Sequence, residues 1–139
     1  MKERIRRVRV LFKELGCQLF DGEMFDECYS AGFSDKQGFH SGFYIDNDSR
    51  FLELVFTFTF SNQLGSYIQG KIEEMILICY EYGCYMNINK EKEEIDFSVF
   101  SKVYYAGLNY NSLKETLSDF KACVESIKNS VSIHDNITE

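Results

Sequence analysis

The segment Gly38-Phe39-His40-Ser41-Gly42 comes closest in this chain to a catalytic motif. A nucleophile elbow, G-x-S-x-G, places its serine in the middle of the motif, on a sharp turn between a strand and a helix. Here Ser41 is the fourth residue, and the flanking residues alternate as in a strand. We therefore expect His40 to be a strand residue near the surface. His134, the other histidine, lies in the C-terminal tail, so we predict no catalytic residues and no enzymatic activity.

Sites for metals and phosphates are also incomplete. Asp46, Asn47 and Asp48 resemble the start of a calcium loop, but Phe51 and Thr57 occupy the places where an EF-hand needs its glycine and its bidentate acid. The glycines do not have the spacing of a dinucleotide fingerprint, and no G-K-[ST] occurs. The sequence therefore predicts a turn rich in Asp and Asn at residues 46–48, with no cofactor and no metal.

Five cysteines stand at irregular spacing: Cys17, Cys28, Cys79, Cys84 and Cys123. Zinc sites usually contain close pairs such as C-x2-C, whereas four residues separate Cys79 from Cys84. The N-terminus lacks the uninterrupted apolar stretch of a secretory signal, which favours a cytoplasmic location and reduced thiols. We expect buried, free thiols, with no disulfide between Cys79 and Cys84.

Length and composition indicate one globular domain. The 139 residues, of which 45% are hydrophobic, suffice for one core, so we assign residues 1–131 to a single domain and 132–139 to a frayed tail. No apolar run reaches the roughly 18 residues that span a bilayer, and a net charge of -7 disfavours nucleic acid. The basic residues cluster in the first helical segment, and we expect this face to pair with acidic residues elsewhere: Glu73, Glu74, Glu91, Glu93 and Glu94.

Three helices are predicted from apolar residues at helical spacing. The first spans about residues 3–15 and is closed by Gly16, and the second is closed in the same way by Gly83. Because the second helix is apolar almost all round, we expect it to be the central, most buried one. A capping box from Ser112 to Glu115 announces the third, whose narrow apolar seam from Leu113 to Val131 suits a surface or a partner.

The strands are predicted from alternation with period two. Residues 51–60 place Leu52, Leu54, Phe56, Phe58 and Phe60 on one face, and we expect Phe56 and Phe58 to be almost fully buried against the second helix. Residues 38–46 and 51–60 form one hairpin, and residues 84–89 and 94–105 form another. A turn at Asp21-Gly22 adjoins the first edge strand, while residues 28–38 fit no clear pattern. The fold class is α+β: an antiparallel sheet with helices mainly on one face, in the order helix, strands, helix, two strands, helix.

The other face of this sheet carries more rings than a face exposed to water needs. Alternation places six apolar and aromatic residues there, among polar ones: Tyr44, Phe51, Val55, Tyr85, Phe100 and Tyr104. Monomers seldom leave a large apolar patch uncovered. We therefore predict that these six residues bind a partner. The candidates are a second copy of this chain, a segment of another protein, or the third helix.

The element order and several junctions resemble the YbjN-like family, which shares its plan with the type III secretion chaperones. Five segments carry the resemblance: "KELGCQLF", "FYIDNDSRFLELVFTF", "IQGKIEEMILICYEYGCYMNIN", "EIDFSVFSKVY" and "NSLKETLSDFKACVESI". It implies a non-enzymatic module that forms a homodimer and holds a segment of another protein, as a chaperone does. The alternative is a regulatory or small-ligand-sensing domain, which would need an enclosed pocket with convergent polar groups.

Overall fold

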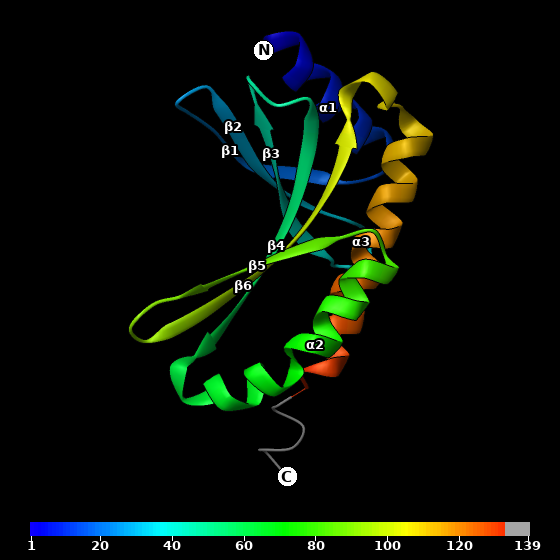
Figure 1. Cartoon of the computed structure of the whole chain (residues 1–139). Coiled ribbons are helices and arrows are strands. Elements are labelled where there is room, and N and C mark those ends of the chain that lie inside the picture. Colours follow the sequence, from blue (N-terminus) through cyan, green and yellow to red (C-terminus); the bar gives the residue numbers. More distant parts are fainter. Residues whose placement is uncertain (133–139) are drawn as a thin grey trace.

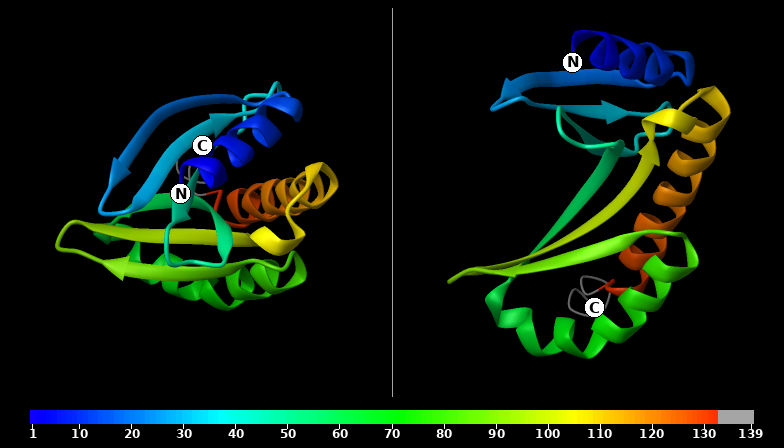
Figure 2. Two further views of the ribbon diagram at one scale, coloured as in Figure 1. Left: turned by 90° about the horizontal axis from the view of Figure 1, so that it is seen from above. Right: turned by 45° about the horizontal axis from the view of Figure 1, so that its top comes forward.

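The computed structural model describes residues 1–132; the predicted tail at 132–139 lies, except for Ser132, outside the described residues. The elements follow one another as α1 (Lys2–Glu14), β1 (Gln18–Phe25), β2 (Cys28–Ser34), β3 (His40–Asp46), β4 (Phe51–Ser61), α2 (Gly65–Glu81), β5 (Tyr85–Lys90), β6 (Glu94–Tyr104) and α3 (Tyr110–Ser130). The six strands form one antiparallel sheet in the order β1-β2-β3-β4-β6-β5, with the helices on one side (Figures 1 and 2). The predicted α+β class and element order are confirmed.

Local signals place the helix ends. Gly16 and Gly83 follow α1 and α2 with φ angles of 86° and 69°, a left-handed conformation that a side chain would strain. The start of α3 differs from the prediction. The capping box there joins Asn109 and Ser112, because the Asn109 side chain accepts from the Ser112 N–H at 2.8 Å and the Ser112 hydroxyl accepts from the Asn109 N–H. Asparagine is a strong N-cap residue, so the helix begins earlier than Ser112.

In the N-terminal strands, the first turn lies at a different position from the predicted one. Residues 28–34, which the sequence left unassigned, form β2 and pair with β3 along their whole length. Strand β1 pairs back from Phe25 opposite Cys28, so the reversal occurs at Asp26 and Glu27, which have φ angles of 48° and 62°. The predicted turn at Asp21-Gly22 is instead an irregularity inside β1, where the register shifts between Phe20 and Glu23.

Helix α3, rather than α2, is the central helix. It contacts α1, α2 and β6, and Figure 1 shows it between the other two helices. Its buried residues are Leu113, Phe120, Cys123, Val124 and Ile127. Helix α2 buries only Ile68, Met75 and Cys79, and it leaves Ile76 and Leu77 49% and 59% exposed. The predictions of a central second helix and a peripheral third helix were therefore wrong.

This arrangement changes what covers β4. Leu52 and Leu54 are fully buried, but Phe56 and Phe58 are only half-buried, so their expected near-complete burial was wrong. Helix α2 packs against α3 and β5 instead of lying along the middle of β4. Phe56 is covered instead by the Phe39 ring at 6.1 Å and by the Lys128 ammonium of α3 at 5.0 Å.

The arginines of α1 bind backbone and aromatic groups of neighbouring elements. Arg4 donates to the carbonyl oxygens of Asp46, Asn47 and Ser49 at 3.2, 3.4 and 3.3 Å, and Arg7 donates to that of Leu108. Arg9 donates to the Tyr29 hydroxyl at 2.7 Å. Among the described residues, Arg6 pairs with Glu3 of its own helix. The expected pairing with acidic residues of α2 and the β5–β6 turn was wrong, because α1 packs near β1 and α3, away from that hairpin (Figure 2).

Candidate partner-binding face

The six residues predicted to bind a partner lie on the sheet face that points away from the helices. Tyr44 belongs to β3, Phe51 and Val55 to β4, Tyr85 to β5, and Phe100 and Tyr104 to β6. The strand register brings them together, since Phe51 lies opposite Tyr104, and both Val55 and Tyr85 lie opposite Phe100. Tyr44 lies opposite Glu53, midway between Phe51 and Val55. We call these six residues the aromatic face.

The rings of the aromatic face pack against one another. Phe51 and Tyr104 meet edge to face with 5.7 Å between ring centroids, and Tyr85 stacks on Phe100 at 5.5 Å. Tyr104 remains 52% exposed, and Tyr44 and Tyr85 remain 39% exposed. Because the rings of neighbouring strands support each other, they form a preorganised surface that leaves its tyrosines accessible.

Lys102 lies at the centre of this face and was missed in the sequence. Its ammonium nitrogen is 5.0, 5.3 and 5.9 Å from the ring centroids of Phe51, Tyr104 and Tyr85. These are cation–π distances. The signal was available, because Lys102 has the same strand parity as Phe100 and Tyr104, but only apolar residues of that parity were assigned to the site.

Glu53 completes the cluster. It lies opposite Lys102 in the β4–β6 register, and its carboxylate accepts a hydrogen bond of 2.7 Å from the Tyr85 hydroxyl. Burial and the neighbouring Glu53 carboxylate raise the pKa of Tyr85 above its ordinary value. The tyrosine is therefore held as a neutral hydrogen-bond donor, and Glu53 stays oriented beside the rings.

The remainder of the β4–β6 outer surface is polar. The Thr57 and Ser98 hydroxyls are hydrogen-bonded at 2.9 Å, and the Thr59 hydroxyl donates to Asp96 at 3.0 Å. The aromatic face therefore has a boundary within the sheet, beyond Val55 and Phe100. Such a change from rings to paired polar groups is typical of a binding patch with a polar rim.

A second apolar surface lies on α2. Ile76, Leu77 and Tyr80 project from one side of the helix and are 49, 59 and 82% exposed. We call these three residues the α2 stripe. Sequence reasoning missed it because the helix is apolar almost all round, which leaves no period to separate the buried side from the exposed side.

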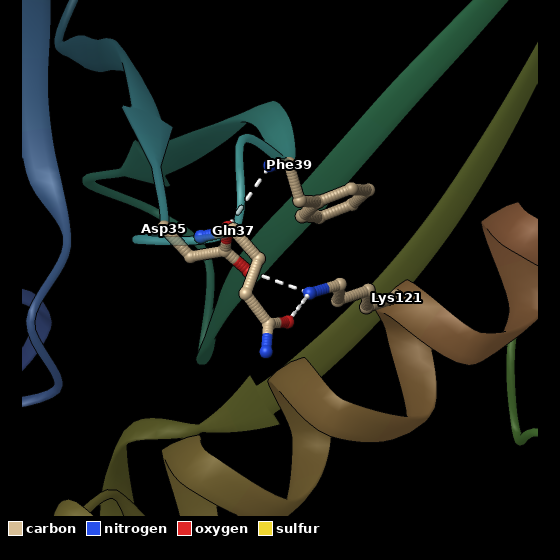
Figure 3. Close-up of polar contacts among 4 residues, drawn as sticks. All are labelled: Asp35, Gln37, Phe39 and Lys121. Carbon is tan, nitrogen blue, oxygen red and sulfur yellow. Dashed lines mark hydrogen bonds and ion pairs between the residues drawn. The ribbon is translucent and has the colours of Figure 1, made fainter.

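A hollow of about 310 Å³ lies between the end of α1, the β2–β3 connection and α3. Figure 3 shows the polar groups beside it: Asp35 accepts from the Lys121 ammonium and from the N–H groups of Gln37 and Phe39, each at 2.9 Å. Lys121 also donates to the Gln37 side-chain carbonyl. These groups satisfy one another and fix the β2–β3 connection onto α3.

This ion pair predicts a pH dependence of stability. Desolvation opposes ionisation of Asp35, but the bonds from Lys121, Phe39 and Gln37 hold the pKa of this carboxyl below its ordinary value. A lowered folded-state pKa contributes stability above the unfolded-state pKa of about 3.9, and the contribution is lost as the pH falls through the folded-state pKa. We therefore expect the stability difference between wild type and Asp35→Asn to shrink below about pH 4. Urea unfolding at several pH values measures this difference; a difference independent of pH would contradict the assignment.

The residues considered for catalysis and metal binding contact neighbouring backbone and aromatic groups of the sheet and its turns. The Ser41 hydroxyl donates to the Val55 carbonyl oxygen, and the His40 ring lies exposed beside Phe20, 6.3 Å between centroids. Asp46 accepts from the N–H of Asp48, which gives the predicted turn. Within residues 1–132, no three His, Cys, Asp or Glu side chains are grouped so as to hold a metal ion. In the same residues, no helix is long and apolar enough to cross a membrane.

Comparisons with known proteins add one structural relative. No family model matches the chain, and no curated protein matches it significantly. The crystal structure of an uncharacterised protein from Methanothermobacter thermautotrophicus is similar, with a TM-score of 0.73 over 93% of this chain and 96% of that one. The two sequences are 8% identical, so the likeness concerns the fold alone.

Proposed function

We propose that this chain is a non-enzymatic protein-binding module that acts as a chaperone, holding a partner segment or a second copy of itself on the aromatic face. The assignment to the YbjN-like family belongs to the same proposal. The observation that carries it is the contiguous cluster of rings around Lys102 and Glu53, whose tyrosines are exposed. Aromatic residues are enriched in interface cores and dominate binding energy there, which supports a protein partner.

The charges of this sheet face indicate the chemistry of the partner. Asp46, Glu53 and Asp96 have the outward strand parity, and Lys102 is already engaged by three rings. A partner segment with Arg or Lys side chains between apolar ones would match both the carboxylates and the ring faces. Because exposed charges are screened by salt, such binding should weaken as the ionic strength rises.

The α2 stripe supports a module with two interfaces. It lies on the helical side, whereas the aromatic face lies on the opposite side of the sheet (Figure 1). Self-association through one surface would therefore leave the other free. A homodimer that holds a partner segment is the form of the proposal that uses both surfaces.

The second candidate is a ligand-sensing domain, and the hollow of about 310 Å³ beside Asp35 and Lys121 favours it. Its volume is at the lower end of the range for small-molecule sites. Asp35, Gln37 and Lys121 at its edge already bond to one another, so these three groups are not available to orient a ligand. We therefore rank this function below protein binding.

Two substitutions in the aromatic face test the proposal, one that introduces a charge and one that removes a ring. Val55→Asp and Tyr104→Ala should each weaken association by about 1 kcal/mol or more, equivalent to at least a fivefold loss of affinity, because they disrupt anchors of the patch. Analytical ultracentrifugation measures self-association, and capture from the native cell extract measures partner binding. Circular dichroism reports whether each variant is folded.

Asn87→Asp is the matched control, because it adds the same charge to an exposed polar position of the same face, opposite Ser98. It should associate as the wild type does. Unchanged association and unchanged capture in Val55→Asp and Tyr104→Ala would remove the aromatic face as the binding site.

A further inference from the structure

Two buried thiols, those of Cys79 and Cys123, meet inside the protein, and a third, Cys84, is held beside them by the backbone. Cys79 comes from α2, Cys123 from α3, and Cys84 immediately precedes β5; they are 2, 0 and 8% exposed. The Cys123 thiol donates to the Cys79 sulfur, with 4.0 Å between the two sulfur atoms. The Cys84 N–H donates to the Cys79 carbonyl oxygen at 2.8 Å, which holds Cys84 close to the end of α2. The sequence separates Cys79 from Cys123 by 44 positions, so only the fold reveals this cluster.

We propose that this cluster is an oxidation site, in which peroxide converts Cys79 and Cys123 into a reversible disulfide and Cys84 is the thiol that reacts first. This inference is independent of the proposed protein-binding function. It goes beyond the expectation of buried, free thiols. It concerns a different pair from Cys79 and Cys84, which we still expect to remain unlinked to each other in the final product.

Geometry favours Cys79 and Cys123 as the final pair. Their sulfur atoms already face each other across the α2–α3 contact, and a disulfide bond of about 2.05 Å needs an approach of roughly 2 Å. Cys84 is the most exposed of the three and is therefore the one a peroxide reaches first. Cys17 is buried near Asp35, and Cys28 is half-buried on the opposite face of the sheet near Asp46 and Glu53.

The protonation states agree with the roles of Cys84 as the first thiol to react and of Cys79 as the last to attack. The hydrogen bond from Cys123 lowers the pKa of Cys79, and donating this proton, together with burial, raises the pKa of Cys123. The neighbouring Cys123 thiol also lowers the pKa of Cys84, whose own thiol donates to the Tyr82 carbonyl oxygen at 3.7 Å. Burial raises the pKa of Cys17 and Cys28, and nearby carboxylates add to the effect. Since the thiolate is the reactive form, the cluster should react before the two isolated cysteines.

The reaction balances with one hydrogen peroxide. The Cys84 thiolate attacks one peroxide oxygen, the O–O bond breaks, and the departing hydroxide takes up a proton to become water, leaving a sulfenic acid on Cys84. The Cys123 thiol then attacks the Cys84 sulfur; the S–O bond breaks, the Cys123 proton passes to the departing hydroxyl, and a disulfide and a second water are formed. Finally the Cys79 thiolate attacks the Cys123 sulfur, and the electron pair of the broken bond returns to Cys84 as a thiolate. Two thiols are oxidised by two electrons, and one peroxide is reduced to two waters.

The product would tie α2 to α3 covalently. It would close a loop between positions 44 apart and fix the helix turn that carries the α2 stripe. By loop-closure entropy, the oxidised protein should melt roughly 10 °C above the reduced protein. A thiol reductant should reverse this shift.

Peptide mapping of the wild-type full chain tests the inference without any variant. The reduced protein is treated with hydrogen peroxide, remaining thiols are blocked with N-ethylmaleimide, and the product is digested with chymotrypsin under non-reducing conditions. Tyr80 and Tyr82 lie between Cys79 and Cys84, so cleavage there distinguishes the two possible links to Cys123. We expect a peptide joining Cys79 to Cys123, with Cys84 blocked by the maleimide. A product linking Cys84 to Cys123, or oxidation confined to Cys28 with both Cys79 and Cys123 reduced, would overturn the inference.

Two variants and a control test the individual roles. Cys123→Ala should abolish the cross-link, and Cys84→Ser should slow its formation at least tenfold while leaving the same product. The matched control Cys28→Ser should leave both the rate and the product unchanged. If Cys84→Ser oxidises at the wild-type rate, Cys84 is not the first thiol to react and that part of the inference fails.

Discussion

Replacing Phe12 with alanine should lower the free energy of unfolding by about 3 to 5 kcal/mol, the usual range for a large aromatic residue removed from a core. Phe12 is fully buried, and its ring stacks on Phe43 at 4.7 Å and packs against Phe33 at 4.9 Å. It is therefore the side chain that joins α1 to β2 and β3. Urea unfolding followed by circular dichroism measures the loss.

Val10→Ala is the control for this prediction, because Val10 is on the same helix but 47% exposed. Its effect should stay within about 0.5 kcal/mol, as for most surface substitutions. A Phe12→Ala variant that loses less than about 1 kcal/mol would show that α1 contributes little to the core.

Arg4→Ala should cost about 1.5 to 3 kcal/mol, a large effect for a charged residue on a helix surface. The guanidinium donates to three carbonyl oxygens of the β3–β4 turn and lies 4.1 Å above the Tyr105 ring. Its removal therefore leaves these carbonyl oxygens without a donor and the Tyr105 ring without its cation. The measurement is again urea unfolding. Arg4→Lys should recover only part of the loss, because an ammonium group cannot reproduce the planar fork of donors.

Arg6→Ala is the matched control on the same helix. Arg6 is exposed and pairs with Glu3, which is also exposed, so its removal should leave the unfolding midpoint unchanged. Equal losses in Arg4→Ala and Arg6→Ala would indicate that helix propensity or net charge, rather than the carbonyl contacts, accounts for the effect.

The sequence predicted those features of the fold that depend on short-range pattern. Parity alone assigned both faces of β4 and β6, since Leu52 and Val99 are fully buried while Glu53 and Phe100 face outward. Gly16 and Gly83 marked helix ends because only glycine adopts their left-handed conformation at little cost. These signals are local, so they survive without knowledge of tertiary contacts.

Features set by tertiary packing were not predictable in the same way. Two helices of this chain are apolar, and the space available beside the sheet decides which of them lies at the centre. The Ile76 side of α2 is exposed, although its composition suggested burial. In β1, the bulge at Asp21 moved the turn to Asp26 because β2 pairs with β3 from Cys28 onward. The local preferences of these residues do not indicate which strand β2 pairs with.

In the candidate site, too, some features follow from local pattern and others depend on tertiary packing. All six residues of the aromatic face were placed by alternation, and the register then brought them together. The position of Lys102 over three rings required the side-chain arrangement of three strands. The thiol cluster required the α2–α3 contact, because Cys79 and Cys123 are distant in sequence.

The pairing of β4 with β6 also affects how the chain folds while it is being synthesised. The two strands are adjacent in the sheet, but α2 and β5 lie between them in the chain, and even the nearest paired residues, Ser61 and Glu94, are about 30 positions apart. At roughly 5 to 20 residues per second, a ribosome needs seconds to produce β6 after β4. During that interval residues 51–60, rich in phenylalanine and β-branched residues, have one edge without its partner strand. Translation speed over residues 62–94 therefore sets how long this phenylalanine-rich strand of the nascent chain stays without its partner.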